Sequence, residues 1–152
     1  GFEVWKTRPQ SLVGVFPRYH QYHPVNNTFT YELRSPERPR SYSIMLTKFM
    51  FMSSEYLYDY TCALPTKVHR YIDEHLNCED IAMNLLVSGM TGAKPVSVLL
   101  GTDDFGTTSG ISIKQGHLSN RSTCMTDLIR LFGRDTLKYN REMFMPYRKR
   151  RT

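Results

Sequence analysis

Hydrophobic residues along this chain alternate between short continuous runs and helical spacing. Short, largely apolar runs at residues 12–16, 43–46 and 96–100 predict buried strands, because strands covered on both faces are mainly hydrophobic. Apolar residues three and four positions apart predict helices, which we place at residues 54–60, 65–75, 77–89 and 122–133. The chain therefore combines a few buried strands with several helices.

The remaining segments are predicted to form two surface loops and one amphipathic strand. Three prolines and three arginines within residues 21–40 predict a long surface loop. Residues 101–120 are rich in glycine and serine and predict a second loop, in which Asp103 and Asp104 belong to a turn and not to a metal site. The first residues, 2–5, have the pattern of an amphipathic strand.

The helix that starts near Asn77 carries two adjacent carboxylates. Asn77 is a good N-cap, and Asp80 follows three residues later, as in a capping box. Glu79 and Asp80 then fall in the first turn. Two interpretations are open at this point: both acids complement the helix dipole, at about 0.3–1 kcal/mol each, or they belong to a site where chemistry takes place.

Arg121 immediately precedes the helix expected from Ser122. A cation is poorly placed at the positive end of a helix dipole. An anion bound there would satisfy the guanidinium and the free backbone N–H groups together. Arg121 is therefore a candidate anion ligand.

The composition limits the chain to one domain or part of one. With 152 residues, 40% of them hydrophobic, it can bury a single core. No run of 18 apolar residues and no signal-peptide pattern is present. The abrupt start without a methionine suggests a piece of a longer protein.

The net charge of +6 comes largely from residues 141–152, which we expect to form a solvated basic tail. A basic module that binds nucleic acid or sulfated glycan is a competing interpretation. Zinc-ligand spacing, RNA-binding strand motifs and helix-turn-helix patterns are all absent, so nucleic acid is the weaker candidate.

The three cysteines, Cys62, Cys78 and Cys124, fit one disulfide and one thiol. They are too few and too far apart for a paired zinc site. A disulfide would imply an oxidising compartment. Two N-glycosylation sequons, which begin at Asn26 and Asn120, are compatible with a secretory route.

Several motifs, taken together, resemble one known family. Residues 68–84 read V-H-x-x-I-D-E-x-x-N-C-E-D-I-A-M-N, and residues 117–124 read H-x-x-x-R-x-x-C. The segments V-G-V-F-P-R-x-H at 13–20 and L-K-Y-N at 137–140 flank them in the matching order. The chain resembles the exostosin-like glycosyltransferase domain, glycosyltransferase family 64, over nearly its whole length.

This resemblance implies an α/β fold: residues 1–152 are the C-terminal portion of a GT-A type nucleotide-sugar transferase fold, with a mixed sheet and flanking helices. It implies a UDP-sugar donor, a divalent metal such as Mn²⁺, and transfer of an N-acetylhexosamine or related sugar with retention at the anomeric carbon. The acceptor would be a glycan or a glycolipid. The full-length protein would lie in the lumen of the Golgi or endoplasmic reticulum, attached to the membrane by an anchor outside this chain.

The resemblance also implies roles for individual residues. Asp80 corresponds to the carboxylate beside the anomeric carbon of the donor, and Arg121 to the arginine that faces the diphosphate. The substrate-binding positions are Asn77, Glu79, Arg18, Tyr31 and His117. Cys78 and Cys124 match a disulfide pair, and Cys62 is left free. The bridge would tie the Asp80 helix to the Arg121 helix and so hold in one geometry the groups that face the sugar cation and the departing diphosphate.

The sequence also departs from the family pattern. The Asp-x-Asp metal motif and the nucleotide-binding strands precede the part that matches residues 2–5, so we assign no metal ligand here and expect the isolated segment to be inactive. A Met-Pro pair is replaced around Asp135, near the expected acceptor side. A non-catalytic glycan- or nucleotide-binding relative is therefore the alternative interpretation.

Overall fold

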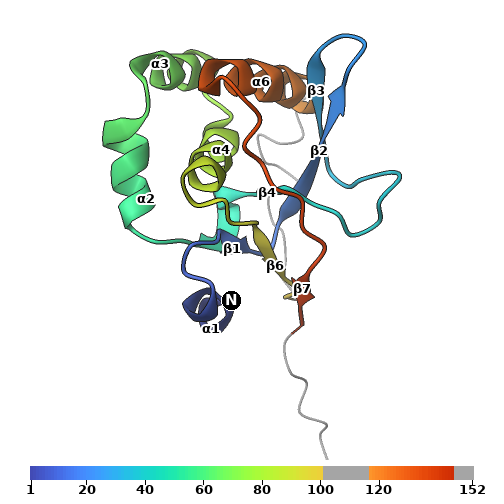
Figure 1. Cartoon of the computed structure of the whole chain (residues 1–152), viewed down its shortest axis with the longest axis vertical. Helices are drawn as coiled ribbons and strands as arrows, with labels where there is room; N and C mark the ends of the chain where they lie inside the picture. The colour runs from blue at the N-terminus through green and yellow to red at the C-terminus, as the bar shows by residue number, and fades with distance from the viewer. Residues whose placement is uncertain (101–116, 146–152) are drawn as a thin grey trace, which may run out of the picture.

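The computed structural model describes residues 1–100 and 117–145. Four short strands form its first sheet, in the order β5 (Met50–Phe51), β1 (Val13–Gly14), β6 (Val96–Val98) and β7 (Met143–Phe144). β1 is antiparallel to β5 and parallel to β6, and β6 is parallel to β7. The expected mixed sheet with flanking helices is confirmed (Figure 1).

A second sheet replaces part of the loop predicted at residues 21–40. β2 (Pro17–His23) and β3 (Thr28–Glu32) form an antiparallel hairpin, and β4 (Ile44–Met45) pairs with the other edge of β2. Asn27, with φ 51°, makes the left-handed turn between β2 and β3. The loop prediction is wrong over the strands of the hairpin and holds only for the turn at residues 24–27 and for residues 33–40.

Contacts with a distant helix explain why β3 is a strand. Thr126 of α6 (His117–Phe132) accepts a hydrogen bond from the backbone N–H of Phe29 at 2.9 Å and donates one to its carbonyl at 3.2 Å. Ser122 accepts a hydrogen bond from the N–H of Tyr31 at 3.0 Å. These hydroxyls satisfy the free edge of β3, as a neighbouring strand would do.

The helices are mostly those expected. They are α1 (Phe2–Thr7), the 3₁₀ turn η1 (Thr47–Phe49), α2 (Glu55–Tyr58) with the π-helical turn η2 (Asp59–Ala63), α3 (Thr66–His75), α4 (Glu79–Thr91) and α6. The predicted strand at residues 2–5 is wrong, because these residues form α1. Trp5 donates its backbone N–H to the Gly1 carbonyl, and Glu3 pairs with Lys6 at 2.7 Å within this exposed helix.

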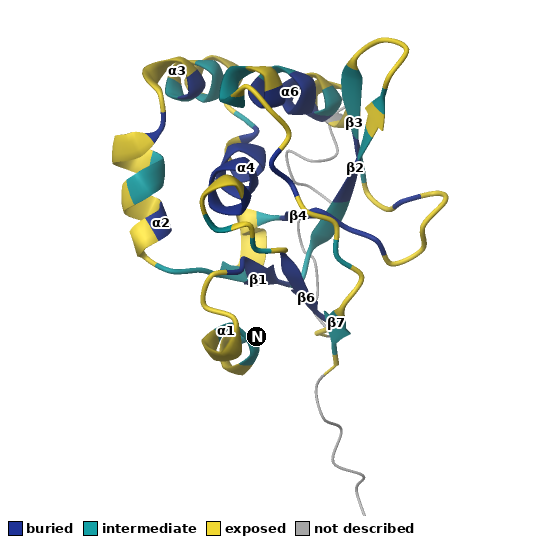
Figure 2. Cartoon of the chain, in the orientation of Figure 1, coloured by how far each residue is buried: buried dark blue, intermediate teal, exposed yellow. Residues whose placement is uncertain are grey.

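The helix α4 is the centre of the core. Its nine consecutive residues from Asp80 to Ser88 are all buried, so it is enclosed on every side (Figure 2). The main cluster joins α4 to α3, α6 and β4 through side chains that include Val68, Ile81, Met125 and Ile44. The buried part of the helix has no solvated face on which a polar residue can lie, so the buried polar residues Asp80, Asn84 and Ser88 each have a specific partner.

The end of the chain departs from the expected tail at residues 141–152. Met143 and Phe144 form β7, and Glu142 pairs with Arg8 at 2.7 Å. Residues 146–152 lie outside the described part. Each helix in residues 1–100 and 117–145 is too short or too polar to reach across a lipid bilayer.

We predict that Asn84→Leu destabilises the fold by about 2–4 kcal/mol. The Asn84 amide accepts from the N–H of Met45 at 2.9 Å and donates to its carbonyl at 2.8 Å, and the leucine leaves both groups buried without partners. Chemical denaturation followed by circular dichroism measures the change. Asn120→Leu, at an exposed position of α6, is the matched control and should change stability by no more than about 0.5 kcal/mol; an equal loss in both variants would contradict the prediction.

We also predict that reduction of the Cys78–Cys124 disulfide lowers the free energy of unfolding by up to about 4 kcal/mol, since the bridge closes a loop across 46 residues. Cys62 is exposed and free, so Cys62→Ser should leave stability unchanged. Peptide mapping under non-reducing conditions, combined with denaturation in the presence and absence of a reductant, tests both statements. A free thiol at Cys78 in protein from an oxidising compartment would contradict the first.

Candidate active site

A buried ion pair joins the two residues predicted to be catalytic. Asp80 is the second residue of α4, and Nη2 of Arg121 lies 2.6 Å from its Oδ1 and 2.5 Å from its Oδ2. The side chains are only 4% and 7% exposed, respectively. The expectation that Arg121 precedes its helix is wrong, because α6 begins at His117 and Arg121 lies in its second turn.

Asn77 and Tyr31 hold the same guanidinium from two other sides. Nη1 of Arg121 donates a hydrogen bond to Oδ1 of Asn77 at 3.0 Å, and the guanidinium carbon lies 4.3 Å from the centre of the Tyr31 ring. The planar cation is thereby fixed by a carboxylate, an amide and an aromatic face. Arg121 therefore has very little freedom to change its direction.

The capping box predicted from Asn77 to Asp80 is not formed. Cys78, in the left-handed conformation with φ 78°, is the N-cap residue of α4, and no side chain caps the helix. The Asn77 oxygen instead accepts from the N–H of Cys78 at 2.8 Å and from Arg121. Oδ1 of Asp80 accepts from the N–H of Ile81 at 2.8 Å. Both side chains are thus turned from capping towards the arginine.

The disulfide implied by the family resemblance is confirmed, since Cys78 and Cys124 are bonded. Cys78 lies two residues before Asp80, and Cys124 lies about one helical turn after Arg121. The bridge therefore ties α4 to α6 beside the ion pair. It thus supports the contact between Asp80 and Arg121. The roles of these two residues at the two charges of the reaction stay a prediction.

Burial and neighbouring charges shift the pKa of Arg121 in opposite directions. Burial by itself would lower the pKa of the guanidinium, but Asp80, Tyr31 and Glu79 together outweigh burial and raise the pKa above its ordinary value. Burial raises the pKa of Tyr31 to about 12, so its hydroxyl stays protonated at neutral pH. The site thus presents a permanent cation and a neutral phenol.

Arg121 retains hydrogen-bonding capacity for a ligand. Its Nε–H is buried and has no partner among the residues that the structure describes. A guanidinium has five N–H donors, and the contacts to Asp80 and Asn77 use only part of them. The guanidinium therefore keeps donors that Asp80 and Asn77 do not use.

The ion pair lines a pocket of about 420 Å³, which we call the Asp80 pocket. Six of the predicted site residues meet there: Arg18, Tyr31, Asn77, Glu79, Asp80 and Arg121. Sequence reasoning missed the other lining residues, which are Leu33, Leu46, Thr47, Lys48, Leu76 and Leu118. Lys48 could have been noticed, because it follows the predicted strand at residues 43–46. Leu76 has the left-handed conformation, with φ 47°.

The seventh predicted residue, His117, is the first residue of α6. Its side chain lies outside the described residues, as does the turn predicted at Asp103 and Asp104. A role for His117 in substrate binding stays a prediction.

The described residues do not form a metal-binding site. Within residues 1–100 and 117–145, no three His, Cys, Asp or Glu side chains lie close enough together to hold an ion. Asp80 is occupied by Arg121 and does not offer two free oxygens. The residues at this site therefore do not fit a metal on their own, and we derive no step through one.

Comparison with known proteins identifies relatives of the whole chain. The model of the glycosyl transferase family 64 domain matches residues 1–148. Human Exostosin-2 is 34% identical over 142 residues, which cover 91% of this chain and 19% of that protein. Glycosylinositol phosphorylceramide mannosyl transferase 1 of Arabidopsis thaliana is also 34% identical over 142 residues, 91% of this chain and 42% of that protein.

A third relative, mouse Exostosin-like 2, is 31% identical over 157 residues, 96% of this chain and 47% of that protein. The chain thus spans between about a fifth and a half of the length of these relatives. Since the family model covers nearly all of its residues, the chain belongs to the glycosyl transferase family 64 domain family.

Proposed function

We propose that this chain contributes the Asp80–Arg121 half of the active site of a retaining glycosyltransferase. The donor would be a UDP-sugar that carries an N-acetylhexosamine or a related sugar, and the acceptor a glycan or glycolipid. The observation that carries the proposal is a buried carboxylate–guanidinium pair that faces a pocket and retains an unpartnered N–H.

The charges of the pair match those of the reaction. Cleavage of the bond between sugar and phosphate leaves an oxocarbenium-like sugar and a diphosphate with added negative charge. Asp80 would stabilise the sugar cation, and the spare donors of Arg121 would bind the departing phosphate oxygen. Because the two groups touch, both charges would develop within a few ångströms of each other.

Retention means that the new bond forms on the face from which the leaving group departs. Two routes give this result: attack by Asp80 to form a glycosyl-enzyme ester, or direct substitution by the acceptor on the same face. Intact-mass measurement after incubation with donor alone separates them. A sugar adduct on the Asp80 peptide supports the first route, and unmodified protein supports the second.

We further propose that a divalent metal such as Mn²⁺ and most contacts to the nucleotide come from residues outside this half of the site. Residues 1–152 alone would then turn over little or no donor. The disulfide supports a location in an oxidising compartment, which the lumen of the Golgi or endoplasmic reticulum provides. A membrane anchor elsewhere in the protein is part of this proposal.

We predict that Asp80→Asn lowers the rate of transfer by at least about 100-fold in the longest natural form of the protein, because the fixed negative charge is lost. The same change breaks a buried ion pair and should cost up to about 3–5 kcal/mol of stability. Transfer must therefore be assayed at a temperature at which circular dichroism shows the variant to be folded. Asp73→Asn, on the exposed face of α3, makes the same change of charge and should retain activity.

Unchanged turnover in folded Asp80→Asn would overturn the assignment. Donor binding without transfer in the unaltered protein would instead support the non-catalytic binding relative.

We predict that Arg121→Lys weakens UDP binding by about tenfold and slows transfer. Lysine keeps the charge, but it cannot contact Asp80 and Asn77 together or stack on Tyr31 as a planar group. Isothermal titration with UDP measures the effect. Arg130→Lys, an exposed position of the same helix, is the control, and equal weakening in both variants would contradict the prediction.

A further inference from the structure

The turn of the β2–β3 hairpin carries one of the two N-glycosylation sequons of this chain, Asn26-Asn27-Thr28. It projects from the body of the molecule at the top of Figure 1. Residues 24–27 form the turn, and all of them are exposed (Figure 2). A bulky and hydrophilic modification fits such a position, because it must stay in solvent after the chain has folded.

The acceptor groups of this sequon are not used by the fold. The side-chain amide of Asn26 and the hydroxyl of Thr28 make no hydrogen bond to any other residue that the structure describes. Asn27 between them is held, since the Tyr22 hydroxyl donates to its Oδ1 at 3.2 Å and Arg130 donates to its carbonyl at 3.1 Å. The turn is thus fixed at its middle residue, while the two groups that define the sequon stay available.

The second sequon, Asn120-Arg121-Ser122, takes part in the contacts of α6. Asn120 is exposed, but Arg121 next to it is buried in the ion pair. The Ser122 hydroxyl already accepts a hydrogen bond from the N–H of Tyr31 at 3.0 Å. An enzyme that recognises asparagine and hydroxyl together finds both unused at residues 26–28, whereas at residues 120–122 the hydroxyl is engaged.

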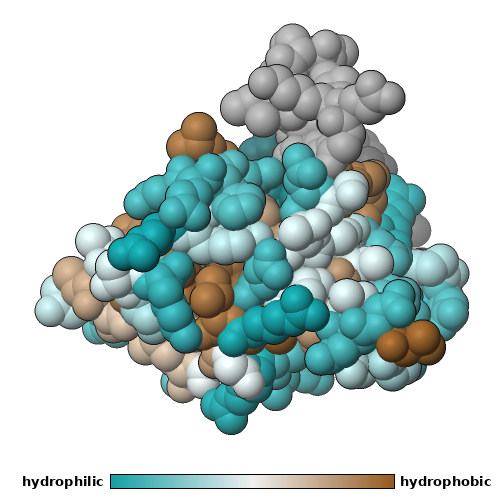
Figure 3. All heavy atoms as spheres, turned by 90° about the horizontal axis from the view of Figure 1, so that it is seen from above, coloured by the Kyte–Doolittle hydropathy of each residue, from teal (hydrophilic) through white to brown (hydrophobic). Residues whose placement is uncertain are grey.

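The surface around the hairpin turn suits a glycan. Val25 is 93% exposed and Tyr22 is 46% exposed, so both leave apolar surface in water. An oligosaccharide on the residue that follows Val25 would shield part of this surface. The face seen from above is otherwise mainly hydrophilic, with isolated hydrophobic side chains (Figure 3). It offers no broad apolar platform that a partner would have to cover.

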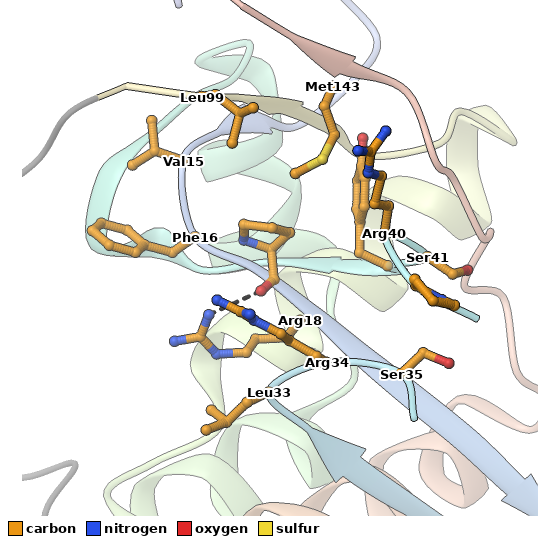
Figure 4. Close-up of a pocket in the computed structure, with 13 residues that line it drawn as sticks. Val15, Phe16, Arg18, Leu33, Arg34, Ser35, Arg40, Ser41, Leu99 and Met143 are labelled. Atoms are coloured by element: carbon orange, nitrogen blue, oxygen red, sulfur yellow. Dashed lines mark hydrogen bonds between the residues drawn. The ribbon is translucent and has the colours of Figure 1, made fainter. Parts of the chain in front are cut away.

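A glycan at the turn would leave the candidate active site open. Arg18, near the start of β2, and Leu33, just after β3, line the Asp80 pocket and the adjoining cavity of about 570 Å³ that Figure 4 shows. Both residues lie at the end of the hairpin opposite the turn. The extended strand from Arg18 to His23 is about 17 Å long. The modification is therefore compatible with the proposed reaction.

We propose that Asn26 carries an N-linked oligosaccharide and is occupied in preference to Asn120. Modification of Asn26 rests on the lumenal location that is part of the proposed function, and the Cys78–Cys124 disulfide supports passage through an oxidising compartment. Nδ2 of Asn26 attacks the anomeric carbon of an oligosaccharide carried on a lipid diphosphate. The C–N bond forms, the C–O bond to the phosphate breaks, the amide nitrogen loses one proton to a base of the glycosylating enzyme, and the lipid diphosphate leaves.

Expression of the longest natural form of the protein in eukaryotic cells tests this, once with its own N-terminus and once with an added secretion signal. Peptide N-glycosidase in heavy-oxygen water converts each glycosylated asparagine to a labelled aspartate, which peptide mass spectrometry locates. In the protein with the added signal, we expect the label at Asn26 in most copies and a lower fraction at Asn120. No label at Asn26, or a higher fraction at Asn120, would overturn the proposal.

Two substitutions of Thr28 make a matched pair at one position. Thr28→Val removes the hydroxyl and should abolish the label at Asn26, whereas Thr28→Ser keeps the hydroxyl and should retain it. Thr28 begins β3, and valine suits a strand, so the fold should be retained, and the thermal midpoint checks this. Label that persists in Thr28→Val would report deamidation of the asparagine and would overturn the proposal, as would complete loss of the label in Thr28→Ser.

A transfer assay separates failure of this inference from failure of the proposed function. Asn26→Gln, at an exposed position away from the Asp80 pocket, should leave kcat and KM unchanged, while Asp80→Asn lowers kcat. Absence of the label at Asn26, with transfer still dependent on Asp80, would overturn the inference and leave the transferase function intact. Label that appears only with the added signal would overturn the lumenal location and the natural modification together.

Discussion

The contact between Asp80 and Arg121 is the constraint on which the arrangement of this half-site depends. Two ions can be buried only if each compensates the other and their remaining hydrogen-bonding groups find partners. Here Asn77, Tyr31 and the N–H of Ile81 supply most of these, and a disulfide at Cys78 joins the two helices beside the pair. A buried ion pair contributes little net stability compared with apolar packing. The position of this ion pair beside a pocket therefore points to a role in the reaction proposed for the site and not in stability.

The helices α4 and α6 carry this pair, and the rest of the fold fixes them. α4 is enclosed by the core, and Asn84 fastens it to the edge of β4. α6 is fastened to the edge of β3 through Ser122 and Thr126. The hairpin that α6 covers contributes Arg18 and Tyr31 to the pocket wall. Core packing and site geometry thus share the same hydrogen bonds.

The Asp80 pocket brings opposite charges together before a substrate enters. Its charged lining residues are the carboxylates Glu79 and Asp80 and the cations Arg18, Lys48 and Arg121. The Asp80–Arg121 pair by itself is neutral, and the other charged side chains leave the lining with one net positive charge. In the proposed reaction, such a site offers a carboxylate to the developing cation and a guanidinium to the developing anion.

Much of this protein was determined by local sequence. Apolar runs and spacing predicted the central strands and α3, α4 and most of α6, because burial sets those patterns residue by residue. The motif around residues 77–84 and the downstream Arg-x-x-Cys pointed to the family, its disulfide and six residues that meet in one pocket. Tertiary contacts decided the rest. The hairpin exists because hydroxyls of α6, almost 100 residues away, satisfy β3, and no local pattern encodes that. Asn77 and Asp80 do not form the expected capping box, because both side chains are directed to a buried guanidinium from another helix, while each accepts the backbone N–H of the residue that follows it. The sequence alone could name the acid and the arginine, but only the folded chain places them against each other.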